Sequence, residues 1–94
     1  MPTVVSGDFE WDDAKAARNL AKHGVSFDEA MTALVDPRAI FIDDGGNPGR
    51  FVAIGMSAAA RVLYVVHVER GAQDRIISAR PATAPEESLY TGGP

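Results

Sequence analysis

The chain has 94 residues, enough for one small domain with a hydrophobic core, and we expect residues 1–94 to form that single domain. Its hydrophobic fraction of 46% and charged fraction of 23% are ordinary for a globular protein. No apolar run approaches the length of a membrane span and no signal peptide is recognisable, so we expect no membrane association. The absence of cysteine excludes disulfides, thiol catalysis and cysteine-based metal sites, and it agrees with a cytoplasmic location.

Charge is distributed unevenly along the chain, whose net charge is −4. Acidic residues dominate positions 1–49, whereas positions 50–80 hold five arginines, two acids and no lysine. A guanidinium group is planar and matches phosphate through two parallel hydrogen bonds, which an ammonium group does not. The arginine-rich half therefore indicates an anionic partner at one face. Its arginines are Arg50, Arg61, Arg70, Arg75 and Arg80.

A first helix is predicted over Asp13–His23. Asp12 suits the N-cap, because its carboxylate can accept from the free amides of the first turn. Gly24 suits the left-handed position that ends a helix, and His23 in the last turn fits helix termination rather than catalysis. The predicted buried stripe consists of Ala16, Ala17, Leu20 and Ala21. Before this helix we expect a loose end over Met1–Gly7 and a short edge strand over residues 8–11.

A second helix is predicted from Ser26 to about Val35. Ser26 and Glu29 have the spacing of a capping box, in which each side chain bonds to the other's backbone amide. Asp36-Pro37 ends the helix, because a residue before proline avoids the helical region.

The second half reads as strands. Val, Ile, Tyr and Phe are enriched in the runs Ala39–Ile42, Phe51–Met56, Val62–Val68 and Ile76–Ala79. The last three are joined by links too short for parallel crossovers, which predicts an antiparallel meander. With a short final helix over Ala84–Tyr90, the fold class is α+β: two N-terminal helices packed on an antiparallel meander. The predicted core is Phe9, Trp11, Leu20, Phe27, Met31, Leu34, Phe51, Ile54, Val66 and Ile77.

His67 is the candidate for proton transfer. Strand alternation puts it on one face with Glu69, and Arg75 follows across the next hairpin. A histidine, a carboxylate and arginines in one patch can transfer a proton beside a phosphate. An alternative of about equal weight is a half-buried histidine that fills space at a strand end, while Glu69 and Arg75 form an ordinary surface ion pair.

An ordered set of short motifs from Phe9 to about Thr83 resembles the BrnT family of bacterial toxins. The motifs are Phe9-Glu10-Trp11-Asp12 with Lys15; Asn19 with Lys22-His23-Gly24-Val25-Ser26-Phe27 and Glu29-Ala30; Arg50-Phe51 through Ile54-Gly55; Val65-Val66-His67 with Glu69-Arg70-Gly71; and Arg75-Ile76-Ile77-Ser78-Ala79-Arg80 with Ala82-Thr83. The chain departs from the family pattern at residues 84–90, which are acidic where a basic helix is typical.

The resemblance implies a RelE-like fold and a ribonuclease that blocks translation. Such cleavage needs no metal or cofactor, since a base removes the proton from a 2′-hydroxyl and an acid protonates the leaving oxygen. Arginines would stabilise the charge that gathers on the phosphate. The implied catalytic residues are His67, Glu69, Arg75 and Arg80, with either His67 or Glu69 as acid/base; Arg50, Arg61 and Arg70 are implied to bind the RNA substrate.

The resemblance also implies a BrnA-like antitoxin that covers the arginines, and operator DNA binding only through the antitoxin complex. A dimeric antitoxin would give a 2:2 heterotetramer. The alternative function is a non-enzymatic module that binds an antitoxin and takes part in promoter autoregulation. Lysine in place of a phosphate-facing arginine distinguishes the two, because a partner-binding surface tolerates that change better than a catalytic site.

Overall fold

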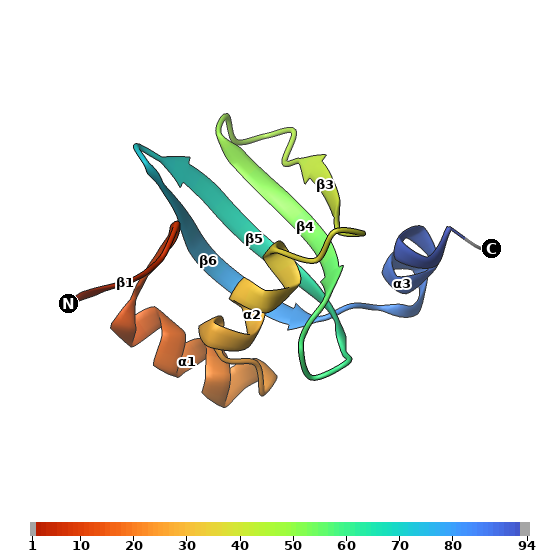
Figure 1. Cartoon of the computed structure of the whole chain (residues 1–94), viewed down its shortest axis with the longest axis horizontal. Helices are drawn as coiled ribbons and strands as arrows, with labels where there is room; N and C mark the ends of the chain where they lie inside the picture. The colour runs from red at the N-terminus through yellow and green to blue at the C-terminus, as the bar shows by residue number, and fades with distance from the viewer. Residues whose placement is uncertain (1, 93–94) are drawn as a thin grey trace.

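The computed structural model describes residues 2–92. The chain folds into a six-stranded sheet with helices on both faces (Figure 1). The elements in chain order are β1 (Thr3–Ser6), β2 (Phe9–Asp12), α1 (Asp13–His23), α2 (Phe27–Leu34), β3 (Ile40–Asp43), β4 (Arg50–Met56), β5 (Val62–Arg70), β6 (Gln73–Pro81) and α3 (Ala84–Thr91). In the sheet the strand order is β1-β2-β6-β5-β4-β3. None of the helices in residues 2–92 is long and apolar enough to cross a membrane.

The sheet is mixed, so the expectation of helices first on a purely antiparallel meander is wrong. Consecutive strands from β3 to β6 do pair antiparallel. However, β2 pairs parallel with β6, through Phe9 with Asp74 and Glu10 with Arg75. Parallel strands need a long crossover, and here the two helices and three strands between β2 and β6 supply it. This pairing is not visible in any local pattern.

The N-terminal segment is also ordered where a loose end was expected. β1 and β2 form a hairpin in which Val4 lies opposite Trp11. Gly7 in the connecting turn has a φ of 59°, a conformation that glycine adopts at no steric cost. β2 is therefore an inner strand, and β1 is the edge. Of the predicted loose end, Met1 lies outside the described residues.

Both predicted ends of α1 are confirmed. The Asp12 side chain accepts a hydrogen bond of 2.8 Å from the Ala14 backbone amide. Gly24 has a φ of 69°, and its N–H donates to the Leu20 carbonyl. The second helix begins as predicted, since Ser26 Oγ accepts from the Glu29 amide at 3.0 Å.

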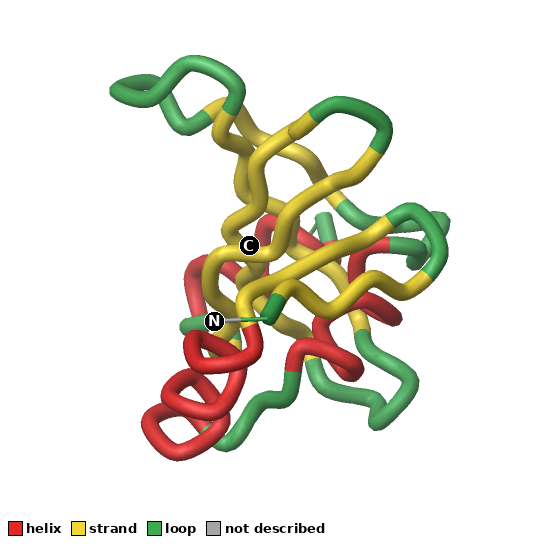
Figure 2. Tube along the Cα trace, turned by 90° about the vertical axis from the view of Figure 1, so that its left-hand side faces the viewer, coloured by secondary structure: helices red, strands yellow, loops and turns green. Residues whose placement is uncertain are grey.

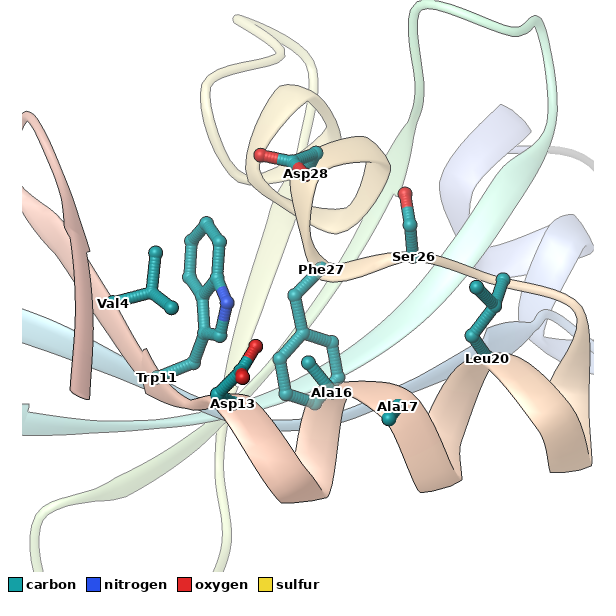
Figure 3. Close-up of a pocket in the computed structure, with 9 residues that line it drawn as sticks. All are labelled: Val4, Trp11, Asp13, Ala16, Ala17, Leu20, Ser26, Phe27 and Asp28. Carbon is teal, nitrogen blue, oxygen red and sulfur yellow. The ribbon is translucent and has the colours of Figure 1, made fainter. Parts of the chain in front are cut away.

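The buried face of α1 differs from the predicted stripe. Leu20 is 51% exposed, whereas Asn19 beside it is 7% exposed. Asn19 Nδ2 donates to the carbonyls of Val25 and Ala79 at 2.9 and 2.8 Å, and the Ala79 amide donates to Asn19 Oδ1 at 3.1 Å. These bonds fix which face of α1 meets β6, and they turn Leu20 to the rim of an apolar pocket between the helices (Figure 3).

The main core lies between α2 and the sheet. Phe27 is 1% exposed, and its ring meets the Trp11 ring edge to face at 6.1 Å, as Figure 3 shows. Glycine is required at position 55, because a Cβ there would lie 2.4 Å from the Ala33 carbonyl oxygen. α2 therefore rests directly on β4. The remaining core side chains are Val25, Ala30, Ala33, Leu34, Ala53, Leu63, Val65, Ile76 and Ala79.

The sheet face opposite α1 and α2 is partly covered by α3, which lies apart from the other helices in Figure 1. Figure 2 shows the strands in yellow and the helices in red from a second side. Ile54 is 1% exposed although strand alternation points it to this face. The predicted burial of Trp11, Phe27, Leu34 and Ile54 is thus confirmed, and that of Leu20 is wrong. Phe9, Met31, Phe51, Val66 and Ile77 are half-buried.

We expect Asn19→Ala to lower the free energy of unfolding by about 3 kcal/mol or more, since each buried polar group left without a partner costs about 1–3 kcal/mol. Leu20→Ala is the matched control one residue away. It should change stability by about 0.5 kcal/mol or less, as exposed positions do. Urea titrations of both variants measure the two effects, and a larger loss for Leu20→Ala would contradict the assigned helix orientation.

Candidate functional site

Three of the predicted arginines lie on the sheet face opposite α1 and α2, which we call the arginine face: Arg50, Arg75 and Arg80. In a regular strand, residues five apart point to opposite sides. A β-bulge changes this in β6, because Val66 pairs with Ser78 whereas the next residue, His67, pairs with Ile76. The extra residue, Ile77, brings Arg75 and Arg80 to the same face.

Arg50 and Arg75 belong to one row across the sheet. Val68 on β5 lies opposite Arg50 on β4 and opposite Arg75 on β6. Arg75 in turn lies beside Glu10 on β2, and the two side chains form an ion pair that is less than one-fifth exposed. The suggested pair of Arg75 with Glu69 does not form, since Glu69 lies opposite Asp74. Arg75 is therefore oriented before any ligand arrives.

Arg80 is held between an aromatic ring and a carboxylate. Its guanidinium carbon lies 3.9 Å from the centre of the Tyr64 ring, in cation–π geometry. Two parallel hydrogen bonds of 2.8 and 2.9 Å join it to Glu86 at the start of α3. Those bonds lower the pKa of Glu86 to about 2. A carboxylate thus occupies the bidentate position that suits a phosphate.

Arg61 lies away from the arginine face. It bonds through Nε to Glu29 Oε2 at 2.9 Å and through Nη2 to the Gly24 carbonyl at 3.0 Å. Glu29, whose pKa this pairing lowers, was predicted to reach back to the Ser26 amide. It instead binds Arg61 and Ser57 Oγ, because these offer a charged fork and a hydroxyl. Arg61 therefore joins the helical layer to the turn before β5.

His67 is enclosed on the helix side of the sheet. Its side chain is 5% exposed, and Nδ1 lies 2.7 Å from Asp74 Oδ1. The ring stands between Phe41 and Phe51, with ring centres 5.9 and 6.0 Å away. Nε2 has no hydrogen-bond partner among the described residues. A carboxylate on one nitrogen and a free second nitrogen suit a base, but Nε2 is buried away from solvent.

The structure thus brings together only part of the predicted site. Glu69 and Arg70 are exposed at the end of β5, next to the row of Arg50 and Arg75. His67 lies on the other side of the sheet from all three residues of the arginine face. Within residues 2–92, no group of three or more His, Asp or Glu side chains has the arrangement of a metal site.

Cations that the sequence interpretation did not select lie on α1. Lys15, Arg18 and Lys22 are exposed and line a groove against β6. Their spacing of three and four residues is the available signal, because it places all three on one side of a helix. The same spacing is typical of the solvated side of an amphipathic helix, so the sequence alone does not single these residues out.

The ion pair of Glu86 with Arg80 predicts a pH dependence of stability. Because folding lowers the Glu86 pKa from 4.5 to about 2, its contribution is complete above pH 4.5 and is lost as the pH falls to about 2. We expect a contribution of about 1 kcal/mol, since Arg80 is one-third exposed and water screens the pair. Wild-type and Glu86→Gln melts should converge in that window, with Glu87→Gln as the control. A constant difference down to pH 2 would contradict the assignment.

Comparison with known proteins agrees with this architecture. Residues 11–86 match the family model described as ribonuclease toxin, BrnT, of type II toxin-antitoxin system. The chain is similar to the crystal structure of the Brucella abortus ribonuclease toxin BrnT, with a TM-score of 0.64 and 28% identity, over 78% of this chain and 92% of that one. Among curated proteins none matches significantly. The chain belongs to the BrnT family of ribonuclease toxins of type II toxin–antitoxin systems.

Proposed function

We propose that the chain is a metal-independent endoribonuclease that inhibits translation and growth in the cytoplasm, where its RNA substrates are. The observation that carries this proposal is the bulge in β6, which gathers Arg50, Arg75 and Arg80 on one face. Guanidinium groups held in fixed positions stabilise the charge that builds on a phosphate during cleavage. Tyr64 beneath Arg80 holds the guanidinium in place through a cation–π contact.

In the proposed reaction, the 2′-hydroxyl of the substrate attacks the adjacent phosphorus and the 5′-oxygen leaves. Arg75 and Arg80 bind the phosphate oxygens, and Arg50 and Arg70 hold neighbouring phosphates. Arg80 must exchange Glu86 for the phosphate, whose charge and bidentate geometry are similar. The Arg61 guanidinium donates two hydrogen bonds to Glu29, so we assign it a structural role near the site and no contact with RNA.

Glu69 is the more accessible of the two acid/base candidates. Strand alternation points both His67 and Glu69 away from the arginine face, but Glu69 is exposed at the end of β5, beside Val68 and its row of Arg50 and Arg75. The His67 side chain is only 5% exposed, and its Nε2 is buried. We therefore assign proton transfer to Glu69 and a packing role to the His67–Asp74 pair.

As a toxin of a type II system, the chain has an antitoxin partner. We propose a BrnA-like antitoxin whose acidic or mixed helical segment covers the arginine face. Contact with operator DNA would come only through that complex, and a dimeric antitoxin would make it a 2:2 heterotetramer.

One observation favours a second function, a non-enzymatic module that binds the antitoxin and takes part in autoregulation. Arg75 and Arg80 are both ion-paired in the free chain, as structural arginines commonly are. Cleavage assays separate the two functions.

Arg80→Ala should lower RNA cleavage about 100-fold or more, as loss of a fixed charge-stabilising donor does. Glu86→Gln breaks the same ion pair and is the matched control; it should keep cleavage at the wild-type level or above. Cleavage of RNA by the purified chain in EDTA, beside growth after induction, measures both. Equal losses in the two variants would mean that the pair is structural.

The same assay tests the remaining roles. Glu69→Gln should lose cleavage at an unchanged melting temperature, whereas Arg61→Gln should lower the melting temperature. Cleavage that stops in EDTA and returns with a divalent ion would rule out the metal-independent reaction. A chain that binds its antitoxin yet cleaves no RNA would favour the non-enzymatic module.

Co-expression with the adjacent reading frame should give a complex that elutes as one species in size exclusion. Arg75→Glu/Arg80→Glu should weaken it, because an acidic segment would then face like charges. Arg38→Glu, on an exposed turn away from this face, is the control. Separate elution of the two proteins at micromolar concentration would contradict the proposed partner.

A further inference from the structure

A second basic surface lies along α1, on the side that meets β6. Lys15, Arg18, Lys22 and His23 line a groove of about 410 Å³, with Asn19 at its floor and Ile77 and Ser78 of β6 as its other wall. We call this the α1 groove. Three of the four basic residues in positions 1–49 of this acidic chain line this one groove.

Among the described residues, Lys15, Arg18 and Lys22 differ from Arg75 and Arg80 of the arginine face in having no ion-paired acidic partner. Arg75, Arg80 and, away from that face, Arg61 each pair with a glutamate. Across the described range 2–92, no ion pair involves Lys15, Arg18 or Lys22, and no acidic residue lines the groove. A concave surface lined by one sign of charge attracts an anion more strongly than a paired surface does.

The α1 groove opens at a free edge of the sheet. β2 pairs with β6 only at Asp74 and Arg75, so β6 has no neighbouring strand on that side from Ile76 onward. Asn19 binds this edge at Ala79 and holds α1 alongside it. Ser78 lines the groove and, lying opposite Val66, belongs to the arginine face as well. The α1 groove and the arginine face therefore share Ser78 of β6.

We propose that the α1 groove binds the phosphate backbone of the RNA strand that is cleaved on the arginine face. The proposal rests on the proposed ribonuclease function and adds a second substrate-binding region to it. From Lys15 to Lys22 the helix advances about 10 Å, which matches about three stacked nucleotides at 3.4 Å each. Cationic side chains without base-specific partners would hold the strand irrespective of sequence.

The test measures binding of a single-stranded oligonucleotide with 2′-O-methyl riboses, which lacks the hydroxyl needed for cleavage. We expect Lys15→Gln, Arg18→Gln and Lys22→Gln each to weaken binding about three- to tenfold at low salt. Each should also reduce the slope of log K against log salt by about 0.7 for every phosphate that the variant no longer neutralises. Arg38→Gln removes the same charge outside the groove and should bind as the wild type does. Thermal melts confirm that each variant is folded.

A cleavage assay separates this proposal from the ribonuclease function. A dinucleoside monophosphate has one phosphate and cannot span both surfaces, so α1-groove variants should cleave it as the wild type does while cleaving long RNA more weakly. If the wild-type chain binds the oligonucleotide through the α1 groove but cleaves no RNA, the groove proposal stands and the proposed ribonuclease function is rejected.

Four results would overturn the groove proposal. Two are wild-type-like oligonucleotide binding by all three variants and no binding by the wild type itself. Another is tighter binding of duplex DNA than of single-stranded RNA, which would assign the groove to operator contacts. The last is loss of the antitoxin complex, with RNA binding intact, in the α1-groove variants.

Discussion

The Asn19 carboxamide is the contact on which the arrangement of layers depends. It binds the carbonyl of Val25, between the two helices, and both backbone groups of Ala79 on β6. One side chain therefore closes the α1–α2 junction and also satisfies the free edge of the last strand. Few alternatives exist for these backbone groups, since each is buried and would otherwise lack a partner. With α1 fixed in rotation, Leu20 faces outward and the lysines lie along β6.

Local structure was largely predictable from the sequence, and long-range structure was not. Asp12, Gly24 and Ser26 mark helix ends because a cap is made by residues a few positions apart. The partner of β2 is 65 positions away, so no local pattern indicates it. The predicted buried face of α1 was wrong because hydrophobicity alone favours burying Leu20 over Asn19. The backbone amide and carbonyl of Ala79 on β6 need hydrogen-bond partners, and the Asn19 carboxamide is buried there to supply them. For the candidate site, the arginines were identified, but their common face depends on a bulge that alternation cannot predict.

In the folded chain, ion pairs partly neutralise the arginine-rich stretch of the sequence. Glutamates from three elements meet three of the arginines: Glu10 with Arg75, Glu29 with Arg61, and Glu86 with Arg80. Two of these pairs join the acidic first half of the chain to the arginine-rich stretch, and the third lies within the second half. The acidic α3, which departs from the family pattern, supplies one of these partners and orients Arg80 over Tyr64. In the proposed function, competition between the Glu86 carboxylate and a substrate phosphate would set how readily Arg80 accepts its ligand.

The parallel pairing of β2 with β6 also has a kinetic consequence. Phe9 cannot pair with Asp74 until nearly four-fifths of the chain has been synthesised. Closing so long a loop costs conformational entropy before its contacts can stabilise the fold, so this pairing forms slowly. β6 carries Arg75, Arg80 and both partners of Asn19, so the same late strand completes the sheet and the arginine face. A nascent chain still attached to its ribosome lacks the arginine face until that strand has emerged. Assembly of the proposed site is therefore expected among the last events of folding.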